Sequence, residues 1–198
     1  GDGSINSRVT DRMLTEQTDV LNRAYSGRDR CDSSLIYTPS YTDTSFRFVQ
    51  DGIVRLTDSD CASDCSERIP ELTSKFAKRE NGLIKVVLCD TQLLGIASFP
   101  GYPENARACL INYNTLPGGA LSKYNGGKTA VHEVGHYLGC FHTFQGGCNG
   151  GDGIADTSSE KEPGYGCPTW NPPKTCGKGK DPIHNFMDYS DDKCMGRW

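Results

Sequence analysis

Residues 132–142 read HEVGHYLGCFH, and this stretch constrains the fold more than any other part of the chain. His132 and His136 are four residues apart, so on an α-helix both imidazoles project from one face, one turn apart. Gly139 follows three residues later and can adopt a backbone conformation that ends a helix and turns the chain back. The fold must therefore contain a helix, a sharp turn, and His142 returning toward the two other histidines.

Three imidazoles that converge on one point suit a zinc ion whose fourth position stays open, as in catalytic rather than structural sites. Glu133 points away from the two helical histidines and can reach a water at that open position. A carboxylate there can take a proton from the water and later deliver it to a leaving amine. Three of the four histidines in the chain fall in this one spacing. The pattern therefore predicts zinc-dependent hydrolysis of peptide bonds, with Glu133 as the general base.

Ten cysteines are spread from Cys31 to Cys194. No C-x2-C pair occurs, and Cys61-x3-Cys65, the nearest arrangement, has no second pair to complete a four-ligand metal site. An even number of dispersed cysteines is typical of disulfides formed in an oxidising compartment. We therefore expect a secreted, extracellular protein.

Composition argues against two classes of partner. The net charge of −4 gives no basic face for nucleic acid. No apolar run approaches the roughly 18 residues of a membrane span, so we expect no membrane partner. The 198 residues suit one domain, which we expect to be a monomer. The first 30 residues contain no signal-peptide core, which predicts a processed mature chain.

Hydrophobic periodicity predicts a mixture of helices and strands before residue 140. The expected helices cover 10–25, 70–76 and 128–139, and the expected strands cover 45–50, 53–57, 83–89, 93–98 and 108–113. The chain beyond them is rich in glycine, proline and cysteine and predicts irregular structure. We expect an α/β (α+β) fold in a single domain, 1–198. A mixed twisted sheet with two helices would form an upper subdomain (1–142), and a cleft would separate it from a disulfide-stapled lower subdomain (143–198).

The extended histidine motif resembles the signature of the metzincin zinc proteases. A metzincin also carries a methionine turn under the metal, and Met187 in HNFMDYS occupies the expected place downstream. Within the metzincins the chain resembles the pappalysin family, particularly its secreted fungal-type members. The similarity is dense from about Asn112 to Met195 and thinner in the N-terminal half. The stretches that carry it are INYNTLPGG (111–119), HTFQGGC (142–148), GDGIADT (151–157), GYGCP (164–168) and DPIHNFMDYSDDKCM (181–195).

This resemblance implies roles for further residues. Tyr189 would lie beside the metal and either bind it or stabilise the oxyanion. The loop GDGIADT is similar to a calcium-binding loop, with hard oxygen donors on Asp152, Asp156 and Thr157. The expected cofactors are thus one catalytic zinc ion and a structural calcium ion.

The resemblance also implies two overlapping disulfides, Cys148–Cys176 and Cys167–Cys194. Sequence alone allows three connectivities for these four cysteines and 15 pairings for the other six. Cys140, inside the zinc motif, is either a disulfide partner or a small buried side chain. Relatives usually continue beyond the last cysteine and carry a pro-segment, so the chain is expected to represent an activated form.

Protein or peptide substrates are the expected partners. A metzincin substrate lies extended along an edge strand, for which 93–98 and 108–113 are both candidates. The acids after Met187 would line the pocket for the residue following the scissile bond, but Lys193 could offset their charge. Two other functions remain as alternatives. One is a catalytically silent, metzincin-like binding protein, and the other is a disulfide-rich structural domain with an incidental metal.

Overall fold

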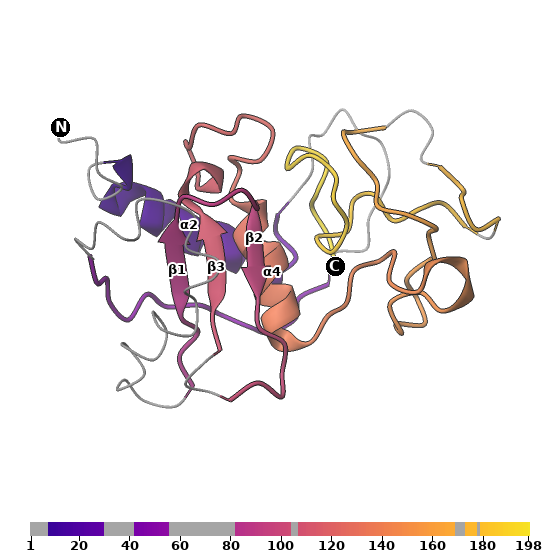
Figure 1. The fold of residues 1–198 in the computed structure, drawn as a ribbon, viewed down its shortest axis with the longest axis horizontal. Coiled ribbons are helices and arrows are strands. Elements are labelled where there is room, and N and C mark those ends of the chain that lie inside the picture. Colours follow the sequence, from indigo (N-terminus) through magenta and orange to yellow (C-terminus); the bar gives the residue numbers. More distant parts are fainter. Residues whose placement is uncertain (1–7, 30–41, 56–81, 104–106, 169–172, 178) are drawn as a thin grey trace.

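The computed structural model describes residues 8–29, 42–55, 82–103, 107–168, 173–177 and 179–198. A three-stranded sheet and two helices form one part of the molecule, and irregular chain from residue 139 onward forms the other (Figure 1). The elements are α2 (Asp11–Tyr25), β1 (Val86–Cys89), β2 (Gly95–Ala97), β3 (Cys109–Asn112), α4 (Lys128–Leu138) and the short 3-10 turns η4 (Tyr113–Thr115) and η5 (Gly147–Asn149). The predicted α+β architecture is confirmed.

The sheet has the strand order β1-β3-β2. β1 runs parallel to β3, with Val86 opposite Cys109, and β2 runs antiparallel to β3, with Gly95 opposite Ile111. β3 therefore has a partner on both sides, whereas β2 has one free edge within the described sheet. Of the two candidate edges for substrate, 93–98 contains the edge strand and 108–113 contains the central one. All three strands are shorter than the sequence predicted.

Helix α2 begins and ends close to its predicted bounds. The Thr10 side chain accepts a hydrogen bond from the Met13 N–H at 3.2 Å, which caps the first turn. After the helix, Gly27 adopts a positive φ of 66°, a conformation that favours glycine. The apolar face of α2 is buried against the core, with Ala24 and Tyr25 at 1% and 2% exposure.

Helix α4 packs against β2, β3 and α2 and is buried from Lys128 to His136. Its apolar residues Val131 and Val134 join a core that includes Ile111 of β3 and Phe186 of the C-terminal part. A helix enclosed on several sides has little freedom to shift, since protein cores are close-packed. The two histidines that α4 carries are therefore held in fixed positions.

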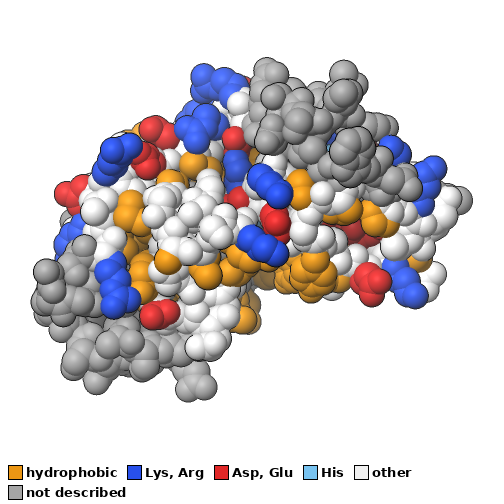
Figure 2. All heavy atoms as spheres, turned by 90° about the horizontal axis from the view of Figure 1, so that it is seen from above, with side chains coloured by type: hydrophobic (Ala, Val, Ile, Leu, Met, Phe, Trp, Pro, Cys, Tyr) orange, Lys and Arg blue, Asp and Glu red, His pale blue; other side chains and the backbone are white. Residues whose placement is uncertain are grey.

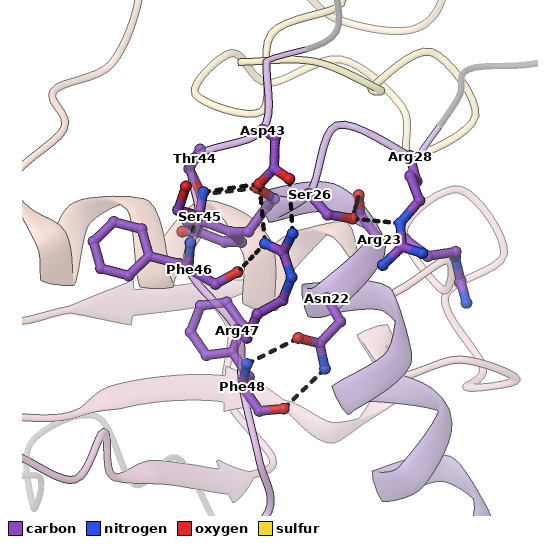
Figure 3. A network of polar contacts seen from close by, with 11 residues as sticks. Asn22, Arg23, Ser26, Arg28, Asp43, Thr44, Ser45, Phe46, Arg47 and Phe48 are labelled. Carbon is purple, nitrogen blue, oxygen red and sulfur yellow. Dashed lines mark hydrogen bonds and ion pairs between the residues drawn. The ribbon is translucent and has the colours of Figure 1, made fainter.

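The predicted strands at 45–50 and 53–57 are wrong over their described residues, which form no strand. The Asn22 side chain replaces a partner strand: its Nδ2 donates to the Phe48 carbonyl and its Oδ1 accepts from the Phe48 N–H, both at 2.8 Å (Figure 3). Alternating apolar residues fit either arrangement, so periodicity could not distinguish them. Residues 56–57 and the predicted helix at 70–76 lie outside the described residues.

The C-terminal part is irregular, as predicted, and two disulfides cross-link it. The structure joins Cys148 to Cys176 and Cys167 to Cys194, the pairs that the family resemblance implies. Cys109 and Cys140 are free thiols. The sequence left two alternatives for Cys140, a disulfide partner or a small buried side chain. The structure has it as a partly buried free thiol.

The last residue, Trp198, brings the C-terminal part back to α2. Its ring lies 4.5 Å from that of Tyr25 and 5.1 Å from that of Phe186, centroid to centroid. The indole N–H donates to the Ala24 carbonyl at 3.2 Å. This contact satisfies the polar atom of a largely apolar side chain and ties the two parts of the molecule together.

No helix among the described residues has the length and apolar character to cross a membrane. On the face shown in Figure 2, basic and acidic side chains are interspersed over the described surface. This distribution agrees with the small net charge of −4.

We predict that Asn22→Ala lowers the free energy of unfolding by about 1–2 kcal/mol, chiefly because it removes the two hydrogen bonds to Phe48 and leaves those backbone groups without their partner. Asp43→Ala is the matched control. It removes the neighbouring exposed ion pair with Arg47 (2.7 Å; Figure 3), which is expected to cost much less. Urea denaturation of both variants measures the difference. Equal losses would show that Asn22 does not anchor the segment.

Candidate metal centre

Three imidazoles meet at the C-terminal half of α4. His132 and His136 come from the helix, and His142 comes from the chain that follows it. One nitrogen of each ring lies within 4.8 Å of the others, and among the described residues this is the one group of three metal-ligating side chains so placed. The spacing predicted from the sequence thus produces the expected convergence.

Backbone carbonyls fix the tautomer of two of these rings. His132 Nδ1 lies 2.7 Å from the Phe186 carbonyl oxygen, and His136 Nδ1 lies 2.8 Å from that of Cys140. A carbonyl can only accept, so each Nδ1 carries the proton and each Nε2 presents a lone pair. His142 Nε2 lies 3.0 Å from His136 Nε2 and 3.2 Å from His132 Nε2. Zinc–nitrogen bonds in tetrahedral geometry separate two ligand atoms by about 3.3 Å, so the donors fit zinc.

Burial also keeps the rings in the form that binds a metal. Burial, and then the neighbouring His136, lower the pKa of His132 to about 3 and that of His142 to about 4. The pKa of His136 is lowered chiefly by burial as well. Neutral imidazole is the metal ligand, so these rings need not lose a proton near neutral pH.

Gly139 makes the third ligand possible. Its φ of 109° lies in the left-handed region, and its N–H bonds the His136 carbonyl at 2.9 Å. This ends α4 and reverses the chain. His142 then stacks on Phe144, with ring centroids 4.6 Å apart and an interplanar angle of 11°. The sequence predicted the turn but did not identify Phe144 as a support for the ligand.

Glu133 lies beside the histidines and is 5% exposed. Its Oε2 has no hydrogen-bond partner among the described residues. Burial raises the pKa of this carboxyl to about 8. The carboxylate packs against β2, where a Cβ added to Gly95 would lie 2.7 Å from Glu133 Cγ. A strand glycine therefore leaves the space that Glu133 occupies, a requirement that sequence analysis did not identify.

Met187 packs against α4 at Gly135. It is 3% exposed, and a Cβ added to Gly135 would lie 2.5 Å from its sulfur. The Met187 N–H donates to Asn185 Oδ1 at 2.8 Å, and its carbonyl accepts from the Thr143 N–H at 3.3 Å. The turn is thus bonded to the residue that follows His142, so it supports two sides of the site.

Tyr189 reaches the open side of the three imidazoles. Its hydroxyl lies 3.2 Å from His142 Nε2, and its side chain remains 37% exposed. Desolvation, followed by the nearby Glu133, raises the pKa of its phenol. The group is therefore a neutral hydrogen-bond donor at neutral pH, positioned at the metal side of the site.

Two of the acids that follow Met187, Asp188 and Asp192, accept hydrogen bonds within the fold. Asp188 is fully buried and accepts hydrogen bonds from the Gly164 N–H at 2.8 Å and the Ser190 hydroxyl at 3.0 Å. Asp192 is 7% exposed, and its Oδ2 accepts from two N–H groups, of Gly126 and Lys128, at the start of α4. Because Gly127 offers no side-chain cap, Asp192 supplies the cap from the C-terminal part.

The three donors of the expected calcium loop differ in their surroundings. Asp152 is 7% exposed and accepts from the Ile154 N–H at 2.9 Å. Asp156 and Thr157 line a polar pocket that also contacts the Cys148–Cys176 disulfide. The loop is therefore folded around Asp152, with Asp156 exposed to solvent.

Sequence comparisons identify a peptidase family. The peptidase M43 family model, described as pregnancy-associated plasma protein-A, matches residues 75–196. The "Extracellular metalloprotease" of Sordaria macrospora is 39% identical over 197 residues, which cover 94% of this chain and 62% of that protein. A protein of the same name from Pyricularia oryzae is 38% identical over 174 residues, covering 80% and 58%. The chain thus spans about three fifths of the length of these relatives.

Solved structures share the fold. Mature mirolysin of Tannerella forsythia, in complex with a cleaved peptide, superposes with a TM-score of 0.70 at 24% identity. The match covers 98% of this chain and 82% of mirolysin. A structure of mirolysin in complex with compound 9 gives a TM-score of 0.69 at 25% identity, with the same coverage.

Proposed function

Because this chain belongs to the peptidase M43 family, we propose that it is a secreted zinc endopeptidase that hydrolyses peptide bonds of proteins. The resemblance to pappalysins and the metzincin-like α+β fold are confirmed. The observation that carries the proposal is the convergence of three imidazoles beside the buried Glu133 carboxyl, whose Oε2 has no hydrogen-bond partner among the described residues. The chain spans about three fifths of the length of its relatives, so the activity of the whole protein is also something that we propose.

His132, His136 and His142 would hold the zinc ion through their Nε2 atoms. When bound, zinc would polarise the scissile carbonyl and acidify a water. The carbonyl groups of Phe186 and Cys140 keep two of the rings in the tautomer that this requires. The rigid helix and the Met187 turn beneath it fix the positions of the ligands.

Glu133 would act as general base and then as general acid. Its carboxylate takes a proton from the attacking water and delivers that proton to the leaving amine nitrogen. Oε2 has no hydrogen-bond partner in the described part of the chain, which supports this role because the oxygen is available to a water. Its packing against Gly95 restricts the carboxylate to one position.

An extended substrate would add to the free edge of β2. The described sheet leaves that edge unpaired, and β2 packs on α4. Main-chain hydrogen bonds to an edge strand hold a peptide without regard to its side chains, which suits an enzyme that acts on many proteins.

We predict that Glu133→Ala reduces casein cleavage at least 10²-fold while the variant still binds zinc, because the general base is lost and the ligands are not. A zinc chelator should abolish cleavage by the wild type. Cleavage is followed by electrophoresis and zinc content by elemental analysis. A zinc-loaded, folded wild type that cleaves neither casein nor gelatin would instead favour the silent binding protein, and an active Glu133→Ala variant would refute the mechanism.

Tyr189 would donate a hydrogen bond to the oxygen on which negative charge develops. We predict that Tyr189→Phe lowers kcat about 10- to 100-fold with little change in KM, since the donor acts mainly in the transition state. Tyr165→Phe is the matched control, because that ring lies 6.2 Å from Tyr189 and is 68% exposed. A Tyr189→Phe variant with full kcat would exclude this role.

The loop with Asp152, Asp156 and Thr157 remains our proposed calcium site, because it offers hard oxygen donors. We predict that 1–10 mM calcium, on the order of the concentrations at which extracellular sites bind, raises the melting temperature of the wild type. This gain should be absent in Asp156→Ala, whereas Asp43→Ala, an exposed acid elsewhere, should retain it. Equal responses in all three proteins would rule out calcium at this loop.

We further propose a single catalytic unit, with an upper subdomain (1–142), a lower subdomain (143–198) and the site between them. The relatives named extracellular metalloproteases support an extracellular location. The proposed state is a monomer, and a stable dimer in sedimentation would contradict it.

A further inference from the structure

Two phenylalanines form an exposed aromatic surface beside the metal centre. The rings of Phe99 and Phe141 stack at 5.3 Å with an interplanar angle of 29°, and Phe99 lies 5.1 Å from the ring of His136. Phe141 is nevertheless 47% exposed. We call Phe99 and Phe141 the aromatic shelf. A large apolar side chain left half exposed next to a reactive centre is available for a ligand.

The shelf is supported from two directions. Phe99 follows β2, while Phe141 follows the turn that ends α4. Pro100 packs over that turn, and a Cβ added to Gly139 would lie 3.4 Å from Pro100 Cγ. The same turn positions His142, so the shelf and the metal ligands are fixed by one piece of structure.

The strand β2 connects the shelf to the general base. Gly95 contacts Glu133, and residues 95, 97 and 99 share one side of an extended chain because side chains alternate. Ala97 packs on the core, and Phe99 reaches His136, so this side faces α4 throughout. Glu133 and the shelf thus lie toward opposite ends of a segment that is roughly 13 Å long at about 3.3 Å per residue.

If the proposed function holds, the positions of Glu133 and the shelf along this segment set the direction of a bound peptide. Glu133 must deliver a proton to the leaving amine, so the scissile nitrogen lies toward Glu133 and Gly95. The acyl half of the substrate then runs the other way, past His136 and over Phe99. A peptide on the β2 edge would therefore run antiparallel to β2, with its amino-terminal part at the shelf.

We propose that Phe99 and Phe141 form a subsite for an apolar substrate side chain at the third or fourth residue before the scissile bond. The stretch from Gly95 to Phe99, about four residues of extended chain and roughly 13 Å long, sets this distance. A leucine-sized side chain would cover the exposed face of Phe141 and remove apolar surface of both partners from water. A charged or small polar side chain would gain nothing there. The shelf thus adds a preference to a binding mode that is otherwise based on the substrate backbone.

Two quenched-fluorescence peptides test the subsite. They share a sequence that the wild type cleaves and differ only in carrying leucine or serine at both of these positions. The expected preference of the wild type for leucine is about tenfold in kcat/KM, which is typical of a partly open apolar contact. Phe141→Ala should reduce it to about twofold, Phe141→Leu should retain most of it, and Ile154→Ala, an exposed apolar residue on another loop (48%), should leave it unchanged.

A binding measurement separates the subsite from catalysis. Zinc-loaded Glu133→Ala binds the fluorescein-labelled peptides without rapid cleavage, and anisotropy gives their dissociation constants. Leucine should bind about tenfold more tightly than serine, and this ratio should fall in the Glu133→Ala, Phe141→Ala double variant. Equal affinities would overturn the subsite even if the enzyme is active. A leucine preference in binding without any cleavage by the wild type would support the subsite and reject the proposed protease function.

Discussion

The site depends on two hydrogen bonds between an imidazole and a backbone carbonyl. The carbonyls of Phe186 and Cys140 accept from the Nδ1 atoms of His132 and His136, so both Nε2 lone pairs face one point. The two carbonyls can reach the histidines only if the chain that carries each of them comes back to α4. The buried Phe186 ring, the Trp198 contact with Ala24 and the turn at Gly139 provide this return. Much of the irregular C-terminal part is thus a support for two ligands.

The same support explains why acidic residues in that part are buried. Asp192 caps the start of α4, and Asp188 holds the loop at Gly164. Both lie in the stretch after Met187, where a pocket lined by acids was the expectation from the sequence. Both carboxylates accept hydrogen bonds from backbone N–H groups instead, because a buried carboxylate without hydrogen bonds is costly. The aromatic shelf is therefore a better candidate for substrate preference, because Phe141 is half exposed to solvent.

Glu133 and the shelf are joined by the edge strand β2 and the residues that directly follow it. Glycine at position 95 gives Glu133 its space, and phenylalanine at position 99 contacts His136. Residues 95–99 thus bring together a free strand edge, a boundary for the Glu133 carboxylate and part of the exposed aromatic surface. The direction proposed for the peptide follows from this sequence of contacts.

The sequence by itself determined the metal ligands and the helix–turn that unites them, because residues 132–142 are local and their spacing matches the helical period. It also determined α2, whose apolar stripe and caps are local, and the irregular nature of the C-terminal part. Only the tertiary structure decided that β2 is the edge strand and that Asn22, rather than a strand, bonds Phe48. It likewise decided that Asp192 caps α4 and that Gly95 faces Glu133. These contacts join residues distant along the chain, and periodicity carries no information about which distant group completes a hydrogen bond or fills a space.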